Sequence, residues 1–349
     1  MRIGKGCEIS TIIDVVPDTV TIGDTCFFAD GIYFASPRVD RNVVFLGTTS
    51  IGDNTFIGNH AVISSGFAYS PDYFVGVSTV ANAKVAHKET AWFGHPPMQL
   101  PRRDVVTADR TLTHEPSIIR YVNRFFWEAL RFTLPIFPIA LGWCWWVAIN
   151  ESTSHFSPTI TALVIAPLAT LAFAFIIIAS IVIMKWTLLG RVRPGQHALW
   201  SCWCSRWDFL FVAWGFYARG TLEQLSGTLF LNAFLRLIGV RIGKRVVLGH
   251  GFTQVVDPDM LSFGDDSTVT CNFQAHSFED RILKIDYIRI DNQATLGHHA
   301  VLFYGATIGA GALVKHHSVI MKNEQIESDA IYCGCPAVRT VSSDAVSSK

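Results

Sequence analysis

A short stretch in the C-terminal half of this sequence gathers side chains that acid–base chemistry uses. The run AHSFEDRILKIDYIR contains His276, Glu279, Asp280, Arg281 and Lys284. A neutral histidine takes a proton from an attacking amine or hydroxyl near physiological pH. A neighbouring carboxylate holds the histidine ring in the useful tautomer. We therefore predict that His276 is a general base and that Glu279 or Asp280 orients it.

Three further residues are predicted to contact the substrate. Arg281 is the expected clamp for a carboxylate or phosphate, and Lys284 follows it on the same loop. Asp257 precedes a Pro-Asp turn and can reach the same face as His276. A solvated charged loop remains the alternative for this run. No metal site is predicted, because the two C-x-C pairs lack the spacing and the second half of a zinc site.

The sequence around this stretch repeats with a period of six, which predicts the scaffold. Neither a helix nor an alternating strand produces that period, whereas a hexapeptide solenoid does. We therefore predict a left-handed parallel β-helix, with a β-sandwich as the alternative. The hexad positions in the C-terminal half are Ile290, Leu296, Leu302, Ile308, Val314 and Ile320, and Ile51, Ile57 and Ile63 continue the pattern in the N-terminal half.

The two halves of the chain repeat each other. The string RIGK occurs at residues 2–5 and again at 241–244. When the halves are aligned on the Asp-Arg of the insert, Ser36 of the first copy stands where His276 stands in the second. The first copy is therefore predicted to be degenerate, and the second is predicted to be the active one.

Two uncharged apolar runs separate the copies, at residues 132–149 and 158–184. They are long enough to cross a bilayer, although two buried helices of a soluble protein are the alternative. Arginines and lysines flank the pair on both outer sides, and the loop between the runs has neither. The positive-inside rule therefore predicts a multi-pass membrane protein with both β-helices in the cytoplasm.

The predicted fold is all-β plus membrane helices: two left-handed β-helices joined by a transmembrane insert. Two shorter runs, the apolar 207–216 and the amphipathic 228–238, are too short or too mixed to be spans; a position in the membrane interface is the hypothesis for both, and whether they enter the membrane is left open. The predicted domains are a first β-helix at 1–101, a helical region at 102–238, a second β-helix at 239–338 and a flexible tail at 339–349.

Composition excludes other classes of protein. The 349 residues include 28 basic and 28 acidic side chains, and half of the residues are hydrophobic. Disordered chains need low hydrophobicity, and nucleic-acid binders need a positive field, so neither class fits. The eight cysteines form no disulfide framework and are expected to be reduced thiols.

Together these motifs resemble a known family. The run CNFQAHSFEDRILKIDYIRI, the two solenoid copies and the apolar insert ending in KWTLLGRVRPGQHALW are similar to the membrane-embedded C-terminal region of ε-poly-L-lysine synthetase-type non-ribosomal peptide synthetases. The resemblance implies amide-bond formation from a phosphopantetheine thioester. This sequence has no adenylation or carrier segment, and it has two solenoid copies where that family has three. It is therefore expected to correspond to a C-terminal portion, either as a fragment or as a stand-alone relative.

Three functions follow from these observations. The first is a membrane-bound acyl- or aminoacyltransferase of condensation type, supplied by a carrier or adenylation domain and acting on an amino-acid or small-molecule acceptor. The second is an acyl-CoA-dependent O- or N-acyltransferase acting on a sugar or lipid. The third is a non-catalytic membrane scaffold. We expect a homo-oligomer, no bound cofactor and no nucleic-acid partner.

Overall fold

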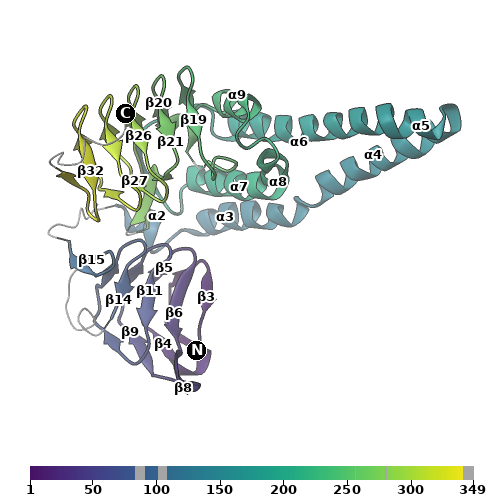
Figure 1. Cartoon of the computed structure of the whole chain (residues 1–349). Coiled ribbons are helices and arrows are strands. Elements are labelled where there is room, and N and C mark those ends of the chain that lie inside the picture. Colours follow the sequence, from purple (N-terminus) through teal and green to yellow (C-terminus); the bar gives the residue numbers. More distant parts are fainter. Residues whose placement is uncertain (83–90, 101–107, 256, 280, 341–349) are drawn as a thin grey trace. The chain divides into compact units, whose positions relative to one another are not determined.

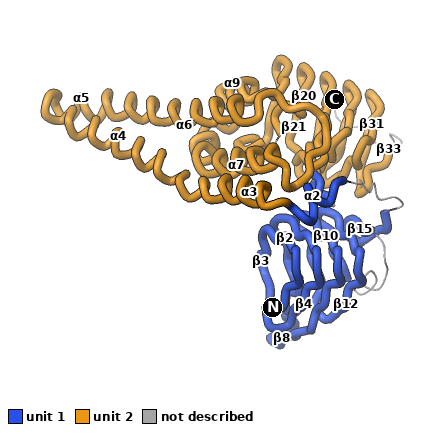
Figure 2. The backbone as a smooth tube through the Cα atoms, turned by 180° about the vertical axis from the view of Figure 1, so that it is seen from behind, with its two compact units in different colours: residues 1–116, 278–282 blue, residues 117–277, 283–349 orange. Residues whose placement is uncertain are grey.

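The computed structural model describes residues 1–82, 91–100, 108–255, 257–279 and 281–340. The chain divides into two compact units (Figure 2). Unit 1 comprises residues 1–116 and 278–282, and unit 2 comprises residues 117–277 and 283–349. The helical region and most of the second repeat copy therefore form one unit.

Unit 1 is a coil of short strands that builds three sheets (Figure 1). Each of the first four turns contributes one strand to each sheet, and β15 and β16 extend the second sheet. Neighbours within a sheet are parallel except β15 and β16. The first sheet contains β1 (Arg2–Ile3), β4 (Val20–Ile22), β9 (Thr49–Ile51) and β12 (Ala68–Tyr69); the second β2 (Glu8–Ile9), β5 (Phe27–Phe28), β10 (Phe56–Ile57), β13 (Phe74–Val75), β15 (Ala91–Phe93) and β16 (Met98–Gln99); the third β3 (Ile12–Asp14), β6 (Ile32–Ser36), β11 (Val62–Ser64) and β14 (Val80–Ala81).

The hexad residues fill the core of this coil. Phe28, Ile57 and Val75 are register partners on consecutive turns, and each is at most 1% exposed. Because successive hexad residues enter the core from successive sheets, one inward side chain per strand suffices to fill it. The predicted period of six is thus observed as parallel strands stacked in register.

An insert leaves this coil after β6. It forms a hairpin of β7 (Arg38–Asp40) and β8 (Val43–Phe45). Arg41 and Asn42 have φ of 47° and 63° at its tip, as a type I′ turn requires. All six strand residues are exposed, including Val39 and Val44.

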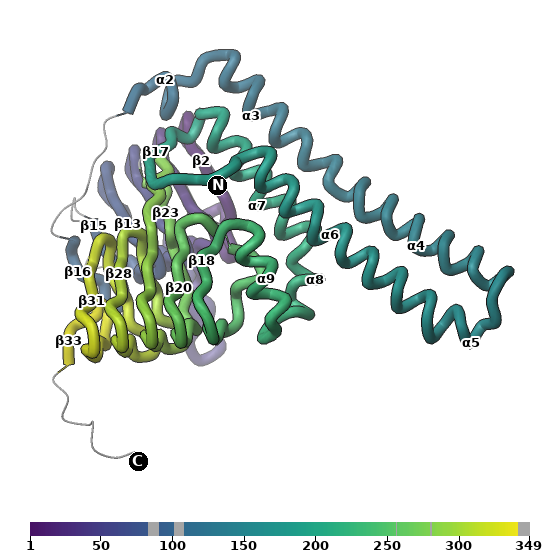
Figure 3. The backbone as a smooth tube through the Cα atoms, turned by 90° about the horizontal axis from the view of Figure 1, so that it is seen from above, coloured from purple at the N-terminus to yellow at the C-terminus, as the bar shows by residue number. Residues whose placement is uncertain are grey.

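Unit 2 contains a second coil of the same design (Figure 3). Ile290, Ile308 and Ile326 are partners spaced by 18 residues, which is three hexads per turn. The strands are β18 (Arg241–Ile242), β20 (Leu261–Phe263), β25 (Ile288–Ile290), β28 (Thr307–Ile308) and β31 (Gln325–Ile326); β19 (Val247–Leu248), β21 (Thr268–Val269), β26 (Thr295–Leu296), β29 (Leu313–Val314), β32 (Ile331–Cys333) and β33 (Val338–Thr340); and β22 (Asn272–Gln274), β27 (Val301–Phe303) and β30 (Val319–Ile320).

The C-terminal end of this coil extends past the predicted domain boundary at residue 338. β33 pairs antiparallel with β32 and includes residues 339 and 340, which the sequence assigned to the tail. Residues 341–349 lie outside the described part of the chain.

The insert of this copy forms β23 (His276–Glu279) and β24 (Ile282–Ile285), in a sheet of order β17-β24-β23 with β17 (Gly195–Ala198).

Two long helical stretches run side by side within unit 2 and turn at their far end (Figure 1). Arg110–His155 and Pro158–Leu188 are long and apolar enough to cross a membrane, and they contain the predicted spans at 132–149 and 158–184. Their elements are α2 (Arg110–Thr113, in unit 1), α3 (Ile118–Leu130), η2 (Arg131–Thr133), α4 (Ile136–His155), α5 (Pro158–Ile160), η3 (Thr161–Ile165) and α6 (Ala166–Leu188).

Three shorter helices follow: α7 (Cys202–Tyr217), α8 (Arg219–Glu223) and α9 (Leu229–Leu237). The run 207–216, for which a membrane-interface position is one hypothesis, is packed inside unit 2. Trp207, Leu210 and Trp214 are each at most 8% exposed, because α7 packs against α3 and α6. On α9, Leu229 and Phe230 remain exposed, so its interfacial position stays a prediction.

Candidate active site

His276 stands at the first position of β23 and is paired with a carboxylate. Its Nδ1 lies 2.6 Å from Oδ2 of Asp257. The histidine side chain is 22% exposed, whereas the aspartate side chain is 1% exposed. A buried carboxylate at this distance accepts a hydrogen bond from Nδ1 and fixes the proton there. The ring therefore has Nε2 available as a proton acceptor.

Asp257 is presented by the turn that precedes β20. It occupies the N-cap position of η4 (Pro258–Met260), where Pro258 fixes the start of the turn. Its second oxygen, Oδ1, accepts a 2.9 Å hydrogen bond from Nε1 of Trp207 on α7. Both carboxylate oxygens thus have a hydrogen-bond donor, as buried polar atoms require.

A cavity of about 150 Å³ lies beside this pair. Its wall combines aromatic and aliphatic groups with the amides of Gln254 and Asn272 and the His276–Asp257 pair. Small-molecule sites commonly have this composition. The lining residues are Gly251, Phe252, Gln254, Val255, Asp257, Leu261, Cys271, Asn272, Phe273, Ala275 and His276.

Two other groups near the pair differ from it in chemistry. Burial raises the pKa of the Cys271 thiol well above its usual range, so the thiolate needed for nucleophilic attack is not formed near neutral pH. Burial also lowers the pKa of His197, and the charge of Asp257 opposes this shift. His197 stacks on Trp203 with ring centroids 3.8 Å apart. Among these groups, only His276 has a carboxylate hydrogen-bonded to its ring.

The same turn is also tied to the long helix α6. Asp259 forms a buried ion pair with Lys185, with Nζ and Oδ2 2.9 Å apart. Asp259 Oδ2 also accepts a 3.1 Å hydrogen bond from the backbone N–H of Val192. In the sequence Asp257-Pro258-Asp259, the first carboxylate is therefore hydrogen-bonded to His276 and the second is ion-paired with Lys185 of α6.

The residues predicted to orient His276 are Glu279 and Asp280, whereas Asp257 is the carboxylate hydrogen-bonded to its ring. Glu279 is 5% exposed and lies three residues after His276 on β23. Alternation along a strand directs side chains three residues apart to opposite faces, so this geometry favours Asp257 as the orienting carboxylate. Asp280 lies outside the described residues. Asp257, predicted to bind substrate, has both oxygens engaged within the protein.

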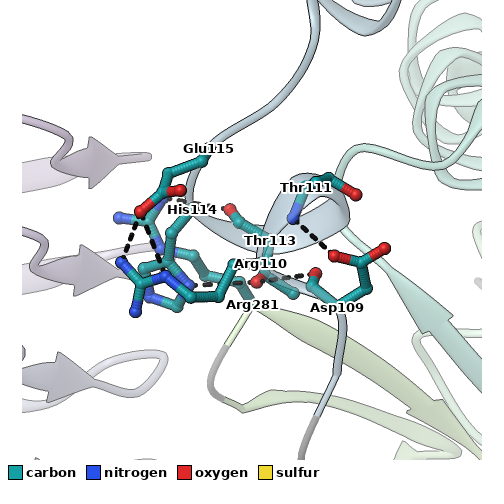
Figure 4. Close-up of polar contacts among 7 residues, drawn as sticks. All are labelled: Asp109, Arg110, Thr111, Thr113, His114, Glu115 and Arg281. Carbon is teal, nitrogen blue, oxygen red and sulfur yellow. Dashed lines mark hydrogen bonds and ion pairs between the residues drawn. The ribbon is translucent and has the colours of Figure 1, made fainter.

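Arg281 and Lys284, the other predicted substrate contacts, are buried. The Arg281 guanidinium donates to the backbone carbonyls of Gly6, Thr25 and Thr113, all within unit 1. These contacts favour a structural role over a substrate clamp. Figure 4 shows Arg281 beside the short helix α2. The Asp109 carboxylate caps this helix by accepting a 2.9 Å hydrogen bond from the backbone N–H of Thr111, and Arg110 forms an ion pair with Glu115 at 2.8 Å.

Sequence reasoning missed Trp207 as part of the site. It lies in an apolar run whose position the sequence left open, and nothing local marks its indole N–H as a donor to a buried carboxylate. A weak signal was present for its partner. The first copy has Val16 before Pro17 where the second has Asp257 before Pro258, so this carboxylate is specific to the second copy.

No family model matches this chain. The chain is 30% identical over 344 residues to the δ-poly-L-ornithine synthetase of Acinetobacter baumannii. The match covers 97% of this chain and 26% of that protein. The relative is a poly-amino-acid synthetase, as the resemblance implied, although the polymer in its name differs.

Solved structures match smaller parts of the chain. A hexapeptide-repeat acetyltransferase of Vibrio cholerae, solved with acetyl coenzyme A, is 19% identical and covers 35% of this chain and 82% of its own, with a TM-score of 0.27. The N-acyltransferase AntD of Bacillus cereus is 17% identical and covers 28% of this chain and 57% of its own, with a TM-score of 0.22. This chain is thus similar, over nearly all of its length, to about a quarter of a poly-amino-acid synthetase.

Proposed function

We propose that this chain is an acyltransferase that moves an acyl or aminoacyl group from a pantetheine thioester to an amine and forms an amide bond. The observation that carries the proposal is the His276–Asp257 pair, 2.6 Å apart at the wall of a cavity. The similarity to a poly-amino-acid synthetase supports this class of reaction.

In the proposed reaction His276 is the general base. Its Nδ1–H donates to Asp257, and Nε2 takes a proton from the acceptor amine as the amine nitrogen attacks the thioester carbonyl. The nitrogen–carbon bond forms, the carbon–sulfur bond breaks, and the proton passes from Nε2 to the departing thiolate. Asp257 stays ionised and stabilises the imidazolium formed in between.

The proposed donor is an aminoacyl group on a phosphopantetheine carrier, and the acceptor is an amino acid. The relative's name makes ornithine the first acceptor and donor to test. We also propose that the helices at Arg110–His155 and Pro158–Leu188 both cross the membrane, leaving two left-handed hexapeptide β-helices in the cytoplasm. The basic residues that flank both spans support that orientation.

The test uses the full chain in lipid nanodiscs, supplied with ornithyl-pantetheine thioester and free ornithine. Mass spectrometry detects the amide product. We expect transfer by the wild type and a loss of about 10²- to 10⁴-fold in His276→Gln, because general-base catalysis is removed. Ser36→Ala, at the matching position of the first copy, is the control and should keep full activity.

Two results would overturn the proposal. One is the absence of amide product from the wild type with the pantetheine thioester. The other is transfer by His276→Gln at the wild-type rate. A parallel reaction with acetyl coenzyme A tests the donor, because transfer from coenzyme A alone would replace the carrier-bound donor with a soluble one.

A further inference from the structure

One face of α7 contacts the segment that carries Asp257. Trp207, Phe211 and Trp214 follow each other at helical spacings of four and three, so they share that face. Trp207 Nε1 donates to Asp257 Oδ1 at 2.9 Å, and Trp214 Nε1 donates to the Thr253 carbonyl at 2.9 Å. The carbonyl of Phe211 accepts from the side-chain amide of Gln254 at 2.9 Å.

The side chain of Gln254 also lies against the helix at Gly215. A methyl group added at Gly215, one residue beyond Trp214, would meet the Gln254 side-chain nitrogen at 2.8 Å. Three hydrogen bonds from one helical face thus hold Thr253, Gln254 and Asp257.

Trp207 is the point that reaches the proposed catalytic pair. Trp207 is 8% exposed, and its ring forms an edge-to-face contact with the ring of His276, with centroids 5.0 Å apart and planes at 82°. A carboxylate held through one oxygen can turn about its terminal torsion, which is broad. The indole N–H holds Oδ1, so Oδ2 stays directed at Nδ1 of His276.

We propose that Trp207 is a positioning residue, which acts through Asp257 to hold His276 in the orientation that accepts a proton. The inference rests on the proposed function for its catalytic consequence. It assigns α7 a second role besides packing: this helix supplies the third member of a Trp–Asp–His chain.

The experiment removes the indole N–H while keeping the ring. Benzothienylalanine at position 207 has a sulfur in place of the N–H and nearly the same shape, and Trp207→Phe is a second variant with natural residues. Trp214→Phe is the matched control, because Trp214 anchors the same segment through Thr253 and makes no hydrogen bond to Asp257. All variants are made in the full chain in nanodiscs.

Two readouts are needed. The first is the Nδ1 proton resonance of His276 in protein labelled with ¹⁵N-histidine, assigned by its loss in His276→Gln. The second is kcat and KM for transfer. In the benzothienylalanine variant we expect the resonance to shift or broaden and kcat to fall about tenfold to a hundredfold, with KM nearly unchanged, because one hydrogen bond to a charged group is lost.

Trp214→Phe should leave the resonance in place and kcat within about twofold of the wild type. The inference is overturned if the benzothienylalanine variant keeps both the resonance and the wild-type kcat. It is also overturned if Trp214→Phe shows the same losses, because the effect is then general loosening of the segment. If the wild type catalyses no transfer, the proposed function fails, and the resonance alone decides whether Trp207 positions the ring.

Discussion

The two coils carry inserts at the same point, and the inserts have opposite surroundings. Ile22 pairs with Ile51 across the first insert, and Phe263 pairs with Ile290 across the second. The first insert is a hairpin whose strand residues are all exposed. In the second, all four residues of β24 are buried. A coil of this design accommodates an insert of either kind, because the strands before and after the insert still pair in register.

The turn that precedes each insert differs in the same way. Val16 caps η1 (Pro17–Thr19) in the first copy, and Asp257 caps η4 in the second. The following aspartate is exposed in the first copy (Asp18) and buried in the second (Asp259). Since Ser36 stands in place of His276, the first copy has neither member of the pair. The scaffold is common to both copies, and the His276–Asp257 pair belongs to the second.

The largest expected effect comes from breaking the pair. Asp257→Asn should lower transfer about 10²- to 10⁴-fold, because an amide neither stabilises the imidazolium nor fixes the same tautomer. Initial rates of amide formation measure this. Val16→Asn places the same residue at the matching position of the first copy and should change the rate by less than about twofold. Equal losses in both variants would contradict the assignment of activity to the second copy.

The buried ion pair is expected to give the next largest effect. Lys185→Met leaves the Asp259 carboxylate buried without its cation, and it should lower the free energy of unfolding by about 3–5 kcal/mol. Thermal unfolding in detergent measures the loss. Asp18→Asn, at the exposed counterpart, should change stability by less than about 0.5 kcal/mol. A Lys185→Met protein as stable as the wild type would show that the pair does not hold the turn to α6.

The two inserts should also differ in their contribution to stability. Leu283 is fully buried in β24, and Leu283→Ala should cost about 2–5 kcal/mol because it leaves a cavity. Val44 on the first insert is 57% exposed, and Val44→Ala should cost less than about 0.5 kcal/mol. Unfolding curves of the two variants provide the test. Similar costs would mean that the exposed hairpin is covered in solution.

The smallest expected effect is the pH dependence that His197 contributes in unit 2. Burial lowers the pKa of His197, so the folded state binds its proton less readily than the unfolded state does. Stability from this residue is therefore present above about pH 6.5 and is lost as the pH falls below it, by at most about 1.4 kcal/mol per pH unit. His197→Phe keeps a ring to stack on Trp203 and should reduce the slope of melting temperature against pH between 7.5 and 5. An unchanged slope would contradict this prediction.

Much of the scaffold could be predicted from the sequence. The hexad period appears as register partners such as Leu302 and Ile320, and the two apolar runs lie in long helices. The packing of the run 207–216 could not be predicted, because hydropathy measures how apolar a segment is and not what covers it. Glu279 was preferred over Asp257 because it is near His276 in sequence, whereas the coil brings the more distant residue within hydrogen-bond reach.

By itself, the sequence determined the repeated scaffold, the apolar helices and the stretch that contains the histidine. Each of these is a local or periodic pattern, and such patterns follow from the geometry of short strands and helices. Only the tertiary structure decided the partners of His276. Asp257 comes from the preceding turn of the same coil and Trp207 from a helix about seventy residues upstream. Both reach the site because burial leaves a carboxylate and an indole N–H no water to bond with.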